Sequence, residues 1–250
     1  MMKEFIRDNI KFIIFLAVFG IIGGYFTGIY TIQILDPDLL DEVLSEIGSV
    51  EILYIVTAIQ SLGYSVILGI IGKILAKKIG LWKNLNFTRK AIIEVVAAAL
   101  LGGIAFIMAD HLIFNNFSEI IENSYAIKPT FEYIVASITY GGVVEEVMLR
   151  LFLMSLISVI IQKISKKEEV NEKILIVANV ISAFLFAAGH LPATVISIGI
   201  TPMIIIRCFL MNGGFGLIFG RLYRKYGIQC SMLAHAGVHI VSKLIWILFI

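Results

Sequence analysis

The sequence predicts an all-α protein, a polytopic transmembrane helical bundle with seven to eight spans. Two observations carry this prediction: 59% of the 250 residues are apolar and only 15% are charged, and the apolar residues gather in long, nearly uncharged runs. A soluble domain carries roughly 25% charged residues, so a chain this poor in charge is typical of a protein embedded in lipid. The net charge of +2 comes with no basic arm, which excludes nucleic acid as a partner.

Seven runs are long enough to cross a bilayer, which takes about 20 helical residues. The first run lacks a small-x-small cleavage site, so we expect a span there and not a signal peptide. The sixth run is long enough to hide an eighth span. Glycines at four-residue spacing, at Gly20, Gly24 and Gly28 and again at Gly216 and Gly220, predict close helix packing. The runs are 12–35, 52–72, 91–109, 133–162, 174–190, 193–220 and 230–250.

The charges between the runs predict the orientation of the chain. Sixteen of the 20 basic residues fall on one side, and most acidic residues fall on the other side with Lys128. The positive-inside rule then places the N-terminus in the cytoplasm. An odd number of spans puts Ile250 outside, and an eighth span brings it back. The sixteen are Lys3, Arg7, Lys11, Lys73, Lys77, Lys78, Lys83, Arg89, Lys90, Lys163, Lys166, Lys167, Lys173, Arg221, Arg224 and Lys225.

Six charged residues remain inside the runs. Each costs several kcal/mol if it is unpaired in hydrocarbon, so each either serves a function or is part of a structural ion pair. Arg207 or Lys243 could bind the carboxylate of a substrate, but for both residues a structural ion pair within the helix packing is favoured. The six are Glu94, Glu145, Glu146, Arg150, Arg207 and Lys243.

The densest charged group combines an ion pair with a free acid. Glu146 and Arg150 stand at i and i+4 with the acid first, which favours a structural pair. Glu145 lies about 100° around the helix and has no local cation, so its pKa is free to rise. A carboxylate desolvated in this way can act as a general base near neutral pH.

Three of the four histidines complete a candidate site. His190 ends a run, while His235 and His239, at i and i+4, share a helix face; His111 is interpreted as interfacial. The His-x-x-x-His spacing is similar to the zincin helix, but Ala236 stands where that motif carries its general base. Three histidines with one open position would satisfy a catalytic zinc. Equally, a Glu–His pair can deprotonate water directly while two imidazoles hold the oxyanion.

The motifs Glu145-Glu146-x-x-x-Arg150, Phe186-x-x-x-His190 and His235-x-x-x-His239, in this order, resemble the CPBP intramembrane proteases. These are the CAAX prenyl endopeptidases of the Ras-converting type and their prokaryotic Abi relatives. The resemblance covers about residues 91–245. It implies an N-terminal two-span region, 1–90, followed by a CPBP-type protease core, 91–250.

The resemblance also implies a role for each motif residue. Glu145 would activate water with His190 as its partner, and His235 and His239 would hold the oxyanion or, with His190, a zinc ion. Glu146, Arg150 and Phe186 would support the site. His239 departs from the family, which most often has Asn there. An amide donates to an oxyanion but binds zinc poorly, whereas an imidazole can do either.

The expected function is hydrolysis of a peptide bond in a membrane-associated substrate, either a prenylated CAAX-type peptide or a bacteriocin-like one. The expected setting is the lipid bilayer of a prokaryotic plasma membrane. The alternatives are a proton- or ion-coupled transporter that uses Glu94, Glu145 and the histidines, and a catalytically inactive relative that acts as a partner protein.

The depth of the predicted site residues poses a problem. Glu145 and His190 each lie 17 to 18 residues from a cytoplasmic lysine, whereas His235 lies 10 residues from Lys225. Either the last helix starts deep in the bilayer or the predicted placement of 193–229 is wrong.

Overall fold

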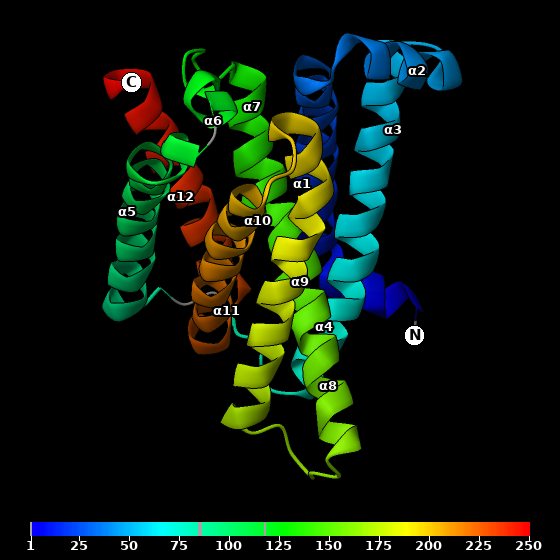
Figure 1. Ribbon diagram of the computed structural model, residues 1–250. Helices are drawn as coiled ribbons and strands as arrows, with labels where there is room; N and C mark the ends of the chain where they lie inside the picture. The colour runs from blue at the N-terminus through cyan, green and yellow to red at the C-terminus, as the bar shows by residue number, and fades with distance from the viewer. Residues whose placement is uncertain (1, 85–86, 118) are drawn as a thin grey trace.

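The computed structural model describes residues 2–84, 87–117 and 119–250, and these residues form helices and turns but no strand. The N-terminal part forms α1 (Met2–Ile34), α2 (Pro37–Ile47), α3 (Val50–Gly63), the π-helix η1 (Tyr64–Leu68) and α4 (Gly69–Lys78). The middle part forms α5 (Arg89–Leu112), the short helix η2 (Phe114–Phe117), α6 (Glu119–Ser124), α7 (Phe131–Ala136), the π-helices η3 (Ser137–Glu145) and η4 (Val147–Met154), and α8 (Ser155–Ile164). The C-terminal part forms α9 (Glu172–Ile198), α10 (Pro202–Cys208), the π-helix η5 (Phe209–Gly213), α11 (Gly214–Tyr226) and α12 (Ile228–Phe249). The helices form one bundle with the two termini toward opposite ends (Figure 1), which confirms the all-α class.

In the part of the chain that the structure describes, six helical segments are long and apolar enough to cross a membrane. The predicted seven to eight spans are therefore more than the structure supports by this measure. The predicted span 133–162 is not among the six; the structure places its residues in α7, η3, η4 and α8. The six are Asn9–Ile34, Val50–Lys78, Arg89–Phe117, Glu172–Ile198, Pro202–Tyr226 and Ile228–Phe249.

The predicted boundary between the runs 174–190 and 193–220 is wrong. Helix α9 continues through Pro192 to Ile198 and ends at Gly199, whose φ of 79° lies in the left-handed region. Proline removes one backbone hydrogen bond, a loss that membrane helices tolerate. The next helix begins where Thr201 caps it through its side chain and Pro202 occupies the first turn, a combination typical of helix starts. The run 193–220 is thus the end of α9 followed by α10, η5 and most of α11, without an eighth span.

The glycines at four-residue spacing pack helices closely, as predicted. A Cβ on Gly24 of α1 would lie 2.8 Å from the Cα of Ala58 in α3, and one on Gly20 would lie 3.0 Å from the Cα of Leu62. In α11, a Cβ on Gly216 would lie 2.9 Å from the Cβ of Ala183 in α9. Each glycine therefore lets two backbones approach to a distance that any side chain would prevent.

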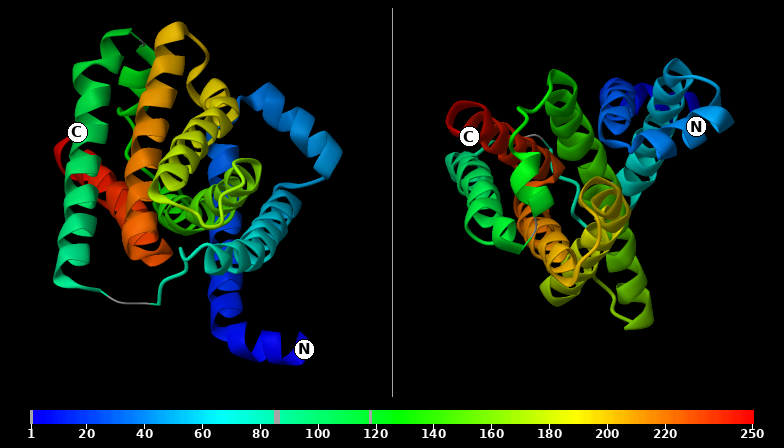
Figure 2. Two further views of the ribbon diagram at one scale, coloured as in Figure 1. Left: turned by 90° about the horizontal axis from the view of Figure 1, so that it is seen from below. Right: turned by 45° about the horizontal axis from the view of Figure 1, so that its top comes forward.

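The segment that carries the two adjacent glutamates lies in the middle of the bundle. Helix α7 and η3 contact α1 on one side and α12 on the other, and α12 packs in turn on α5 (Figure 2). Around the next turns Val147, Leu151 and Met154 are fully buried in the largest apolar cluster. The glutamates are thus held on a segment that is packed from several directions.

The depth problem raised by His235 has a structural answer. Helix α12 begins at Ile228, two residues after α11 ends at Tyr226. In Figure 1 the lower end of α11 lies well above the lower ends of α8 and α9. The last helix therefore starts further into the bundle than the lower ends of α8 and α9, which brings His235 to the level of Glu145 and His190.

Candidate active site

Two consecutive glycines let α12 approach η3. A Cβ on Gly142 would lie 2.7 Å from the Cβ of Ala236 and 2.9 Å from its Cα. A Cβ on Gly141 would lie 2.9 Å from His239 Nε2 and 4.0 Å from His235 Nε2. Both imidazoles thus turn Nε2 toward the backbone of η3. This backbone is π-helical, a conformation that occurs often at functional sites.

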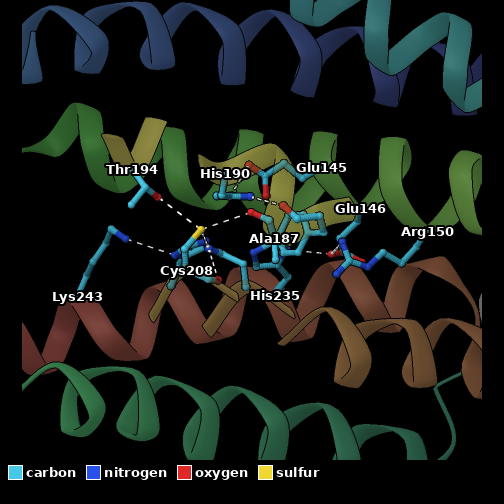
Figure 3. A network of polar contacts seen from close by, with 12 residues as sticks. Glu145, Glu146, Arg150, Ala187, His190, Thr194, Cys208, His235 and Lys243 are labelled. Carbon is cyan, nitrogen blue, oxygen red and sulfur yellow. Dashed lines mark hydrogen bonds and ion pairs between the residues drawn. The ribbon is translucent and has the colours of Figure 1, made fainter. Parts of the chain in front are cut away.

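Glu145 and His190 face each other from η3 and α9 (Figure 3). Glu145 Oε1 lies 3.8 Å from His190 Nε2, and the two side chains are 17% and 31% exposed. His190 Nδ1 lies 2.9 Å from the carbonyl oxygen of Phe186. A carbonyl only accepts, so Nδ1 carries the proton and Nε2, with its lone pair, faces Glu145. Both side chains are thus accessible, and Glu145 Oε1 and His190 Nε2 lie slightly further apart than the two atoms of a hydrogen bond.

Glu146 lies in the opposite environment. It is fully buried, and its Oε1 lies 3.2 Å from Arg150 Nη1 and 2.9 Å from His235 Nδ1. Ser231 Oγ donates a further hydrogen bond to its second oxygen. The predicted i, i+4 pair of Glu146 with Arg150 is therefore confirmed. The carboxylate of Glu146 also contacts His235 Nδ1 and so orients this imidazole of α12.

Aromatic rings surround this buried pair. The Arg150 guanidinium lies 4.4 Å from the centre of the Phe186 ring, a cation–π contact. Phe186 also contacts His190 edge-on at 4.5 Å between ring centres, and Phe219 stacks on His235 at 4.4 Å. Phe186 thus contacts both Arg150 of the pair and His190.

His235 and His239 stack on each other, with ring centres 5.0 Å apart and planes 26° apart. Their Nδ1 atoms face different partners. That of His235 faces the Glu146 carboxylate at 2.9 Å, and that of His239 faces Lys243 Nζ at 3.4 Å. The structure therefore brings Glu145, His190, His235 and His239 of the predicted site together.

The remaining charged residues of the predicted spans lie in other networks. Arg207 binds Asp110 through two hydrogen bonds of 2.6 Å, and Tyr125 donates a third to the same carboxylate. Glu94 binds Arg221, Lys225 and Tyr226. Arg207 and Glu94 thus take structural pairs, and among the described residues neither has a hydrogen bond or ion pair that links it to Glu145, as a relay would require.

Sequence reasoning gave no role to Ser231, Phe219 or Gly141, although each touches a site residue. The spacing of Ser231, four residues before His235, was the available signal, because residues at i and i+4 share a helix face. The contacts of Phe219 and Gly141 depend on how α11 and η3 pack on α12. No spacing within one helix reports such contacts.

The imidazole nitrogens are the candidate metal ligands of this site. Among the residues that the structure describes, no group of three or more His, Cys, Asp or Glu side chains could hold a metal ion. His190 and His235 each use Nδ1 within the protein and leave Nε2 free, as metal-bound imidazoles do. The spacing of the histidines, and not their hydrogen bonding, is therefore what departs from a zinc site in this structure.

Residues 127–241 match the model of the Rce1-like family, described as type II CAAX prenyl endopeptidase Rce1-like. The matched segment contains all three motifs, and the match confirms the resemblance. It supports the general class of CAAX-type intramembrane proteases. No curated protein and no solved structure matches the chain.

Proposed function

We propose that this protein is an intramembrane endopeptidase that hydrolyses a peptide bond of a membrane-associated substrate, with a prenylated CAAX-type peptide as the first substrate to test. The observation that carries the proposal is the accessible pair of Glu145 Oε1 and His190 Nε2, 3.8 Å apart. The Rce1-like domain, which contains both residues, supports the reaction class.

The separation of this pair suits one water molecule. A polar pair more than 3.5 Å apart is commonly bridged by water. Since Glu145 and His190 Nε2 both accept, such a water donates one hydrogen to each and keeps its lone pairs for attack. Glu145 then takes a proton as the oxygen bonds to the carbonyl carbon, which is general base catalysis.

His235 and His239 are proposed to hold the oxyanion that this attack creates, because both turn Nε2 toward the same part of η3. Glu146 accepts from His235 Nδ1, and a carboxylate in this position stabilises the imidazolium form. When the intermediate collapses, protonated Glu145 returns its proton to the leaving amine. Collapse releases a peptide with a new carboxylic acid and a shorter peptide with a free amine, and Glu145 is again a carboxylate. The second proton of the water leaves the new acid for the amine, which gives a carboxylate and an ammonium group.

The test uses the purified full chain in lipid vesicles with a farnesylated, fluorogenic CAAX-type peptide. Glu145→Gln and His190→Asn should each lower kcat by about 10²–10⁴-fold, the usual contribution of a general base. The matched control is Glu94→Gln, which removes an intramembrane carboxylate from a separate ion-pair network and should leave kcat within about twofold. Equal cleavage by wild type and both site variants would overturn the proposal.

Two further experiments test which substrate the protein cleaves and whether it needs a metal cofactor. The same peptide without its prenyl group, together with a bacteriocin-like membrane peptide, tests whether prenylation is required. Metal analysis and assay after chelation test zinc. Full activity in a metal-free sample supports the steps above, whereas loss of activity that zinc restores would replace them with a zinc-dependent mechanism.

A further inference from the structure

Lys243 is a buried cation without a carboxylate partner among the residues that the structure describes. Its side chain is 4% exposed and lies one helical turn beyond His239 on α12. Its Nζ lies 3.4 Å from His239 Nδ1 and 4.2 Å from the centre of the Tyr133 ring. A buried charge is usually paired, and one that is not tends to have a function.

The partner of each Nδ1 determines where the imidazole carries its proton. A lysine ammonium has three donors and no acceptor, so a charged Lys243 donates across this 3.4 Å contact and His239 Nδ1 accepts. A neutral imidazole whose Nδ1 accepts carries its proton on Nε2. In His239 that nitrogen is the atom directed at Gly141, in the space where the proposed oxyanion forms.

The neighbouring imidazole provides a contrast. His235 Nδ1 meets a carboxylate, Glu146, which only accepts. His235 therefore carries its proton on Nδ1 and, as a neutral ring, presents a lone pair at Nε2. Of the two stacked rings, His239 is the one whose partner makes Nε2 a donor in the neutral form.

We propose that Lys243 is a positioning residue that fixes His239 as the Nε2–H tautomer, so that His239 donates to the oxyanion of the reaction proposed above. An asparagine at this position would need no second residue to make it a donor, because its amide always carries an N–H. The inference rests on the proposed function, and its tests are chosen so that the two can fail separately.

The first test is a double-mutant cycle with the farnesylated peptide in lipid vesicles. Loss of one oxyanion donor costs about 10²–10³-fold in kcat, so Lys243→Met should lower kcat by about 10²-fold with little change in KM. In a His239→Asn background, which supplies its own donor, the same change should lower kcat by less than about threefold. Lys243→Arg, which keeps a donor-only cation, should retain more activity than Lys243→Met.

The matched control is Lys163→Met, which removes an exposed cation at the end of α8. It should leave kcat unchanged. An equal loss from Lys243→Met in both backgrounds would overturn the inference, since the role of Lys243 would then be independent of His239. A rise in KM that disappears with a C-terminally amidated peptide would also overturn it and assign Lys243 to the substrate carboxylate.

The second test needs neither substrate nor a folded Lys243 variant. In wild-type protein labelled with ¹⁵N-histidine in detergent micelles, the His239 signals, identified by their loss in His239→Asn, should show a protonated Nε2 and an unprotonated Nδ1. The opposite tautomer would overturn the inference even if the protein cleaves peptides. If the protein cleaves none, the proposed function fails, and this spectrum still decides the tautomer.

Discussion

Glu145 and Glu146 are neighbours in the chain, but the structure surrounds them differently. Glu146 is enclosed by Arg150, His235 and Ser231, whereas Glu145 remains partly exposed beside His190. The i, i+4 spacing of the first pair was enough to predict this division. The sequence therefore indicated which acid is paired and buried and which is not.

The buried pair of Glu146 and Arg150 should stabilise the fold, whereas the unpaired Glu145 should not. Arg150→Met leaves the Glu146 carboxylate without its cation, and breaking a buried pair from one side costs about 3–5 kcal/mol. Glu145→Gln removes no paired charge and should change the free energy of unfolding by less than about 0.5 kcal/mol. Unfolding in mixed micelles of detergent and SDS measures both.

The double variant Glu146→Gln with Arg150→Met serves as the control for this prediction. It removes both charges, so it should be less destabilised than Arg150→Met alone. If Arg150→Met unfolds like wild type, the pair contributes nothing measurable and the structural role given to it is wrong.

At the scale of elements, single-helix periodicity predicted the helices well but not the contacts between them. The spacing of Gly20, Gly24 and Gly28 is a property of one helix and predicted its packing on α3. The site depends on η3 meeting α12 at Gly142 and Ala236, residues that are 94 positions apart. No local pattern encodes such a meeting, and the π-helical geometry of η3 has no periodic signature of its own.

At the end of α9, by contrast, the sequence predicted a feature that the structure lacks, namely a helix boundary. The sequence places a boundary near Pro192 because proline commonly ends helices in water. In a bundle of apolar helices, neighbouring groups satisfy the freed carbonyl and the helix continues. His190 therefore lies in the interior of α9, which fixes its backbone more firmly than a helix end would.

The contact of η3 with α12 yields a prediction at this scale. In Gly142→Ala the new Cβ meets the Cα of Ala236 at 2.9 Å, and backbone atoms cannot turn aside as a side chain can. Helix α12 must shift, and His235 and His239 shift with it. A displacement of about 1 Å can cost about 10²-fold in rate, so cleavage of the farnesylated peptide should fall by about that factor.

Gly63→Ala is the matched control, because a Cβ there meets no atom within 4 Å. It should leave cleavage unchanged and, being in a helix interior, stabilise the fold by up to about 1 kcal/mol. If Gly142→Ala cleaves as fast as Gly63→Ala, close approach of the two helices is not what positions the histidines.

At the scale of the whole molecule, the charges separate toward the two ends of the bundle. The acidic helix α2 lies at the upper end in Figure 1, and the lysine-rich loop between α8 and α9 lies at the lower end. The sequence predicted this separation of charges because such a prediction requires only the order of the spans and loops along the chain. The positive-inside rule predicts that the lower end is cytoplasmic.

This sidedness predicts which surface positions an impermeant reagent reaches in intact bacterial cells. Asp41→Cys on α2 should react with a membrane-impermeant maleimide from outside, whereas Lys166→Cys between α8 and α9 should react only after lysis. The natural cysteines do not confuse the readout, because Cys208 and Cys230 are buried. Reaction of Lys166→Cys in intact cells, with protection of Asp41→Cys, would invert the orientation and place the deep start of α12 on the outer side.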